Sequence, residues 1–139
     1  MEAYFDNSAT TIVTDSVKDI VVKTMTEDFG NPSAMHMVGV KAEKYIKEAQ
    51  ENIAKVDPKE IFFTSGGTES NNMAIIGTAM ANKRKGNKII TTSVEHSSVL
   101  ATMKYLEEQG FEVIYLPVDR YGVVQMEALE KEMTEDTIL

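Results

Sequence analysis

Apolar residues recur every three or four positions in the first part of the chain. Over residues 17–25 this spacing predicts a helix between Thr14 and Gly30. A longer stretch of the same kind, residues 38–56, predicts a second helix that ends at a turn. Residues 1–55 are therefore expected to form an extended segment followed by two helices.

The pattern then changes to short β-rich runs separated by helical stretches. Strands are predicted at residues 61–64, 88–94 and 112–116, and residues 137–139 resemble the opening of a fourth. Strands that alternate with helices are typical of βαβ crossovers. The sequence thus predicts an α/β fold over residues 60–139, with a mainly parallel sheet flanked by helices. No repeat or linker separates the two regions, so we expect a single unit.

Three helices are predicted in this second region. The first runs to about Lys85, where a basic cluster at residues 83–85 would complement the helix dipole. The second has an apolar inner face that includes Val99 and Leu106, and Gly110 closes it. The third covers residues 126–133.

The last predicted strand has only three residues, 137–139. A parallel sheet is not expected to end in this way, because such a strand has few pairing groups and little apolar surface to bury. We therefore expect the chain to be truncated at its C-terminus, and residues 1–139 to be a single incomplete unit.

The amino-acid composition excludes several classes of partner and site. The 139 residues are 42% hydrophobic and carry a net charge of −8, with 22 acidic and 14 basic residues. Nucleic acid is an unsuitable partner, because its binding depends on clustered Lys and Arg. There is no cysteine, which excludes disulfides, thiolate metal sites and a thiol nucleophile in this chain. No apolar run resembles a membrane span or a secretory leader, so we expect a cytoplasmic protein.

A glycine-containing polar cluster, residues 64–72, follows the first predicted strand and opens a helix. In open α/β sheets, ligands bind at the carboxyl ends of the strands. Gly66 and Gly67 let the backbone approach a ligand, and free helix-start amides with the Ser65 and Thr68 hydroxyls favour a phosphate. The cluster is neither a Walker A loop nor a GxGxxG fingerprint, so a non-nucleotide phosphate fits better. The alternative is a tight turn with a helix cap.

His96 lies in a second polar cluster, residues 93–98, at the end of the next strand. Its imidazole could stack on a flat ring or move protons near neutral pH, although a histidine at a helix start can also be purely structural. The other histidine, His36, has no partner at a recognisable spacing and is interpreted as structural. No metal site is predicted.

Four segments together resemble the cysteine desulfurases of the class V aminotransferase family, which have the fold-type-I architecture of pyridoxal-phosphate enzymes. Their order and spacing cover nearly the whole chain. They are residues 4–11, residues 29–33 with His36 and Gly39, residues 63–72, and residues 95–99. The resemblance implies that Gly67 and Thr68 hold the phosphate of pyridoxal 5′-phosphate. It also implies that His96 stacks on the pyridine ring and serves as a proton shuttle.

The same resemblance implies the reaction and its partners. Members of the family convert L-cysteine to alanine and pass a persulfide sulfur to an acceptor protein, for iron–sulfur cluster or thio-cofactor assembly. They are homodimers, so we expect this chain to self-associate. The Schiff-base lysine, the Asp partner of the pyridine nitrogen and the persulfide cysteine would all lie beyond position 139. Two small departures are Ser8 for the usual Ala and Ile12 for the usual Pro.

Other functions remain open at this point. A selenocysteine lyase or another class V enzyme would share the phosphate loop and the stacking histidine. A non-catalytic α/β module could keep the phosphate-binding helix start and act only in binding or assembly. In each case we expect the chain alone to be catalytically incomplete.

Overall fold

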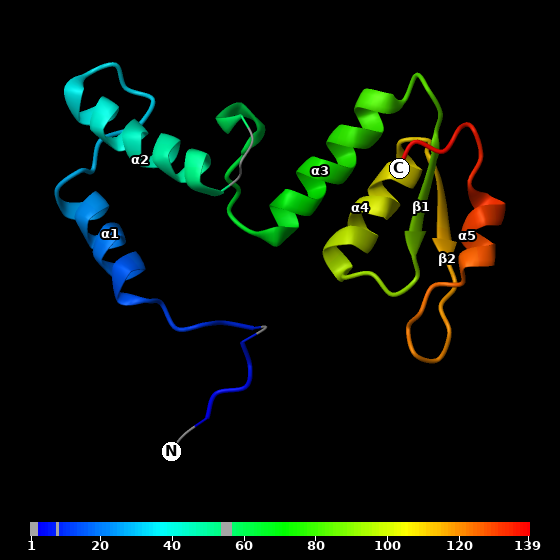
Figure 1. The fold of residues 1–139 in the computed structure, drawn as a ribbon. Coiled ribbons are helices and arrows are strands. Elements are labelled where there is room, and N and C mark those ends of the chain that lie inside the picture. Colours follow the sequence, from blue (N-terminus) through cyan, green and yellow to red (C-terminus); the bar gives the residue numbers. More distant parts are fainter. Residues whose placement is uncertain (1–2, 8, 54–56) are drawn as a thin grey trace. The chain divides into compact units, whose positions relative to one another are not determined.

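The computed structural model describes residues 3–7, 9–53 and 57–139 of the chain (Figure 1). The chain divides into two compact units, Met1–Phe62 and Phe63–Leu139. Each unit is described by itself. None of the described helices is both long enough and apolar enough to cross a membrane.

The first unit contains the two helices that the apolar spacing predicts. Helix α1 spans Asp15–Thr26 and α2 spans Met37–Ile53, followed by a short 3-10 helix, η1, at Pro58–Glu60. Asp57 caps η1 by accepting a hydrogen bond from the Lys59 amide. The predicted last turn of α2, and Ser8 of the extended segment, lie outside the described residues.

A buried carboxylate joins the two helices of this unit. Asp28 is only 4% exposed, and it accepts hydrogen bonds from Lys41 Nζ (2.8 Å) and from the Tyr45 hydroxyl (2.6 Å). These bonds hold the pKa of the Asp28 carboxyl below its ordinary value. Lys23 of α1 completes the cluster at 3.9 Å from the same carboxylate. A charge buried in this way is stable only because it is paired and hydrogen-bonded.

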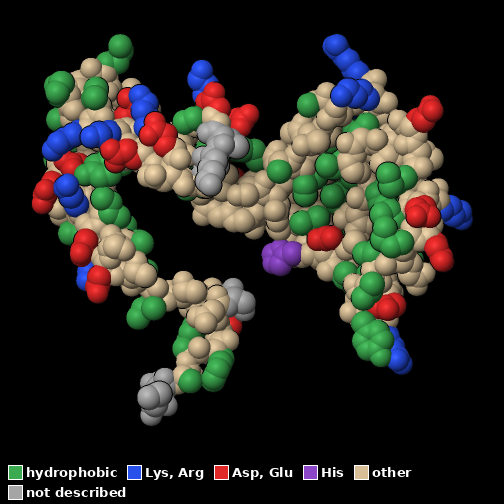
Figure 2. Space-filling model, viewed as in Figure 1, with side chains coloured by type: hydrophobic (Ala, Val, Ile, Leu, Met, Phe, Trp, Pro, Cys, Tyr) green, Lys and Arg blue, Asp and Glu red, His purple; other side chains and the backbone are tan. Residues whose placement is uncertain are grey.

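The apolar faces of the first unit, in contrast, are exposed. Among its described residues no hydrophobic side chain is buried, and Figure 2 shows hydrophobic side chains on its surface. Met25 on the predicted inner stripe of α1 is 74% exposed. Isolated helices of this length are marginal in water. Because α1 has no buried side chain, packing within the unit adds little to its stability.

The second unit is a parallel βαβ arrangement, as predicted. Strand β1 (Lys88–Thr92) leads through α4 (Ser97–Glu108) to β2 (Glu112–Leu116). The two strands pair in parallel from Lys88 opposite Glu112 to Thr92 opposite Leu116. Helix α3 (Gly67–Asn82) precedes this motif and α5 (Met126–Glu132) follows it. Gly110, with φ +88°, ends α4 in the left-handed conformation that favours glycine.

The last residues of the chain pair with β1, on the side away from β2. The Ile138 amide donates to the Lys88 carbonyl and the Ile90 amide donates to the Leu139 carbonyl, both at 2.9 Å. The bridge between Lys88 and Thr137 is parallel. The predicted opening of a further parallel strand is therefore confirmed.

Residues 61–64 do not form the predicted strand. Ile61 is extended, but no backbone hydrogen bond joins residues 61–64 to a strand among the described residues, and Phe62 is 73% exposed. A β-rich run becomes a strand only when a neighbouring strand pairs with its amides and carbonyls. In this structure the Ile61 carbonyl instead accepts a hydrogen bond from the Gln50 side chain.

Helix α3 ends at Asn82, three residues before the predicted end. The basic cluster follows the helix directly, as expected, and Lys83 reaches the end of α4. Its Nζ donates to the Gln109 carbonyl (3.2 Å) and lies 5.0 Å from the centre of the Phe111 ring. The cation thus links the C-terminal ends of both helices.

The hydrophobic core lies between the sheet and the pair α3 and α4. Figure 1 shows these two helices on one side of the strands and α5 on the other. Buried side chains from α3, β1, α4 and the residue just before β2 form one cluster, which comprises Ala79, Ile89, Met103, Leu106 and Phe111. The predicted inner face of α4 is confirmed. On the α5 side, an apolar hollow is lined by residues that include Ile90, Leu116, Leu129 and Met133.

Two glycines give opposite predictions for substitution by alanine. A Cβ at Gly86 would lie 2.0 Å from the Asp136 carbonyl oxygen, whereas a Cβ at Gly77 in α3 would meet nothing within 4 Å. Gly86→Ala should therefore lower the free energy of unfolding by about 1–3 kcal/mol. Gly77→Ala should raise it by about 0.5–1 kcal/mol, because glycine is unfavourable inside a helix. Urea unfolding followed by circular dichroism checks both signs, and equal effects would contradict the close approach at Gly86.

Candidate functional site

The N-terminal end of α3 is open, as expected for an anion-binding helix start. The first hydrogen bond at this end runs from the Ser70 amide to the Gly66 carbonyl (3.1 Å). The amides of Gly67, Thr68 and Glu69 have no partner among the described residues. Apart from the adjoining residues and the backbone of the helix itself, no atom lies within 4 Å of the position that a Cβ on Gly67 would occupy. Three free donors therefore lie at the positive end of a 16-residue helix.

The hydroxyls around this helix start are not equally available. Ser65 donates through its amide (2.6 Å) and its hydroxyl (2.7 Å) to the Glu69 carboxylate, which holds the pKa of Glu69 below its ordinary value. The Ser65 hydroxyl is therefore occupied by Glu69 in this structure, and its expected contribution to a phosphate site stays a prediction. The Thr68 hydroxyl makes no hydrogen bond to any described residue. Thr68 is the hydroxyl that remains available to a ligand.

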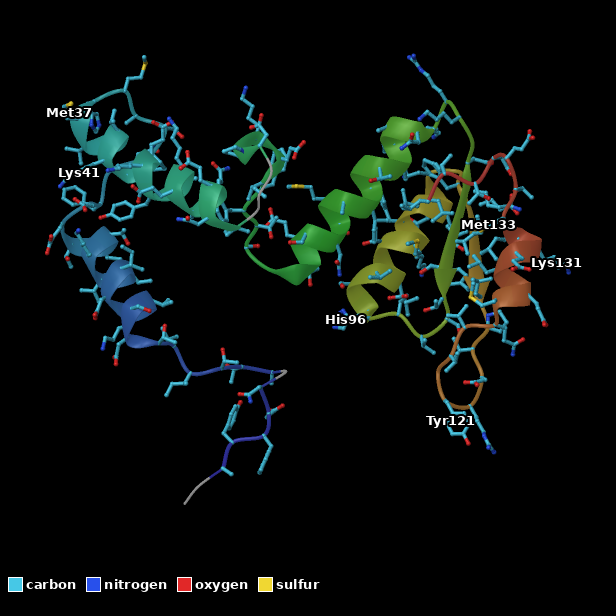
Figure 3. The ribbon with its side chains drawn as sticks, viewed as in Figure 1. Met37, Lys41, His96, Tyr121, Lys131 and Met133 are labelled. Atoms are coloured by element: carbon cyan, nitrogen blue, oxygen red, sulfur yellow. The ribbon has the colours of Figure 1, made fainter. Side chains whose placement is uncertain are left out.

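His96 is the N-terminal cap of α4. Its Nδ1 accepts a hydrogen bond from the Ser98 amide (3.1 Å) and lies 2.9 Å from the Ser98 hydroxyl. The residue is exposed, and in Figure 3 the ring lies at the start of α4 and points away from the helix. Nε2 has no partner among the described residues. One nitrogen is thus used for capping, while the other nitrogen and the ring face stay accessible.

His36 caps α2 in a similar way. The Gly39 amide donates to its Nδ1 (3.2 Å), and the Val40 amide donates to its carbonyl (3.1 Å). The structural interpretation of this histidine accounts for its position.

A hydrogen-bonded network connects the starts of α3 and α4. Asn71 Nδ2 donates to the Ser98 hydroxyl (2.9 Å), and the single proton of the Thr102 hydroxyl is shared between two acceptors, Asn72 Oδ1 (2.6 Å) and the Ser98 carbonyl (2.7 Å). Asn72 Nδ2 in turn donates to the Thr68 carbonyl (2.8 Å). The network therefore connects the first turn of α3, which contains Thr68, to the start of α4, which His96 caps.

Sequence reasoning did not identify this network. A signal was present, because Ser98 and Thr102 lie one helical turn apart on the face of α4 that also carries Met103. Polar residues on an otherwise buried face require hydrogen-bond partners. Their partners on α3, however, lie 27 and 30 residues away in the sequence.

The arrangement offers free amides and a hydroxyl for an anion, together with a nearby imidazole. These donors suit the phosphate of a planar, phosphorylated cofactor better than a metal ion, since they are neutral N–H and O–H groups. Among the described residues no cluster of His, Cys, Asp or Glu could hold a metal ion.

Thr102→Val should weaken the fold by removing the donor to Asn72 Oδ1. Thr102 is 2% exposed, so a valine of similar size fits its position but leaves the half-buried Asn72 Oδ1 without this donor. We expect the free energy of unfolding to fall by about 1–3 kcal/mol. Thr78→Val is the matched control in α3, where the threonine is exposed, and should change it by less than about 0.5 kcal/mol. Urea unfolding of both variants measures the difference, and indistinguishable midpoints would show that the network adds no stability.

Residues 3–139 match the family described as aminotransferase class-V. Among curated proteins, "Cysteine desulfurase IscS 1" of Archaeoglobus fulgidus is 48% identical over 139 residues, which cover 98% of this chain and 36% of the relative. The chain therefore spans little more than a third of that relative's length.

Solved structures agree with this likeness. A chain described as a NIFS-like protein superposes with a TM-score of 0.89 at 46% identity, and the match covers 99% of this chain and 38% of the other. A second structure, described as SspA in complex with cysteine, gives a TM-score of 0.85 at 39% identity over 96% of this chain and 40% of its own. The expected fold and resemblance are confirmed, and the chain belongs to the aminotransferase class-V family.

Proposed function

We propose that this chain forms part of a cytoplasmic, pyridoxal-phosphate-dependent cysteine desulfurase. One observation carries the proposal: the open amide end of α3 and the capping histidine of α4 are joined by a single hydrogen-bonded network. The names of the relatives support the reaction, and the neighbour described as a complex with cysteine supports the substrate.

In this proposal Gly67 and Thr68 hold the cofactor phosphate. Their amides have no other partner among the described residues, and the Thr68 hydroxyl adds a further donor. His96 contributes the accessible face of its ring and can hold or release a proton at Nε2, because Nδ1 is occupied by the Ser98 amide. Pyridoxal phosphate, when bound, supplies an electron sink for the amino-acid substrate.

These 139 residues contain no cysteine, so the thiol that receives sulfur from L-cysteine has to come from outside them. The family resemblance assigns three further groups to residues absent from this sequence: that cysteine, the Schiff-base lysine and the Asp partner of the pyridine nitrogen. We propose that the complete enzyme is a homodimer that passes sulfur to an acceptor protein. The isolated chain would bind cofactor without turnover.

Cofactor binding can be tested without the missing lysine. Pyridoxamine phosphate has no aldehyde and cannot form adducts with surface lysines. Adding it should shift the NMR amide signals of Gly67 and Thr68 and the ring signals of His96, whereas pyridoxamine without phosphate should not. Thr68→Val should weaken binding by about tenfold, since it removes a hydrogen bond to a charged group. Thr78→Val should leave the affinity unchanged, and shifts scattered away from the start of α3 would contradict the assignment.

The reaction can be tested in a chimera. Residues 3–139 would replace the matching segment of the Archaeoglobus fulgidus relative, and alanine release from L-cysteine would be measured. We expect the chimera to be active and the 139-residue chain alone to be inactive. His96→Ala in the chimera should lower the rate by about 10²–10⁴-fold, the range for a lost acid or base.

The control variant is His36→Asn, because asparagine also caps helices and should preserve the rate. Selenocysteine serves as the competing substrate. A chimera that turns over selenocysteine and not cysteine would overturn the desulfurase proposal in favour of a lyase.

A further inference from the structure

His96 makes one more polar contact than its capping role requires. A cap needs only one acceptor for a free helix amide. His96 Nδ1 accepts from the Ser98 amide and also lies 2.9 Å from the Ser98 hydroxyl, which itself accepts a hydrogen bond from Asn71. The Ser98 side chain is therefore linked to the imidazole on one side and to α3 on the other.

The direction of these hydrogen bonds can be assigned. A backbone N–H can only donate, so Nδ1 of His96 must present a lone pair to the Ser98 amide. Asn71 Nδ2 donates to the Ser98 oxygen, which leaves the serine proton free to point at Nδ1. The amide can only donate, and with the serine proton aimed at Nδ1 both neighbouring groups act as donors, an arrangement that fits the neutral ring only when its proton is on Nε2.

We propose that Ser98, oriented by Asn71, is a positioning residue that keeps His96 in the tautomer with its proton on Nε2. Ser98 is 8% exposed, so water competes little for its hydroxyl, and it lies on α4 where that helix packs against α3. The accessible nitrogen of the ring is then always a donor when the imidazole is neutral. That this nitrogen would donate toward a bound cofactor rests on the proposed function. The tautomer itself does not.

The ratio of the two tautomers can be measured directly in the unliganded 139-residue chain. Long-range ¹H–¹⁵N NMR spectra distinguish a protonated ring nitrogen from an unprotonated one. Spectra are recorded at rising pH until the ring signals no longer change, and those final spectra report the neutral ring. The chain has two histidines, and a His36→Asn variant assigns their signals.

We expect the wild-type ring to be predominantly protonated on Nε2. Ser98→Ala should lower the ratio of the Nε2–H to the Nδ1–H form by about 2- to 10-fold, the effect of one neutral hydrogen bond. Ser98→Thr retains a hydroxyl and should restore the ratio. Asn71→Ala should shift it in the same direction as Ser98→Ala, because the serine hydroxyl is then free to rotate.

Ser97→Ala is the matched control. This serine is the first residue of α4, it is exposed, and its hydroxyl makes no hydrogen bond to the described residues. An unchanged ratio in Ser98→Ala, or an equal change in Ser97→Ala, would overturn the proposal. If Ser98→Ala loses its dispersed amide spectrum, Asn71→Ala decides the question by the same ratio. Because no ligand is added, failure of the chain to bind pyridoxamine phosphate would leave this result unaffected.

Discussion

The hydrogen bonds between Asn71 and Ser98 and between Asn72 and Thr102 connect the two helices on which the candidate site depends. Neither helix carries a complete site. The start of α3 supplies free amides and the Thr68 hydroxyl, and the start of α4 supplies the imidazole of His96. Because the four side chains of this network are partly or fully buried, their bonds compete little with water and have a defined geometry. The site is therefore a property of the packed pair.

The hydrophobic core maintains the packing that these bonds require. Ala79 on α3 lets the helices and the sheet approach closely, and Leu106 on α4 is fully buried against Ile89 of β1. The same helix faces carry apolar residues toward their C-terminal ends and polar partners toward their N-terminal ends. Burial supplies the stabilisation, and the polar end supplies the fixed orientation.

The first unit follows a different principle. Its best-defined interaction is polar, since Asp28 lies buried among Lys41, Tyr45 and Lys23, while the apolar stripe of α1 is exposed. A charged cluster fixes the direction in which α2 leaves the turn at residues 31–34, but it contributes little stabilisation beyond offsetting its own desolvation. Exposed apolar faces of this extent are typical of surfaces that another part of a protein or a partner covers.

Much of the fold and part of the site could be predicted from the sequence. Helical and strand periodicity, the glycine after α4 and the polar starts of α3 and α4 all depend on neighbours within a few residues. The sequence therefore located Gly67, Thr68 and His96 correctly at helix starts. The absence of a strand at residues 61–64 and the pairing of Asn71 with Ser98 depended on the tertiary structure, whereas the hydrogen bonds from Ser65 to Glu69, four residues away, are local. Hydrogen bonds between distant residues exist only once packing has brought the two groups together, and no local pattern encodes that choice of partner.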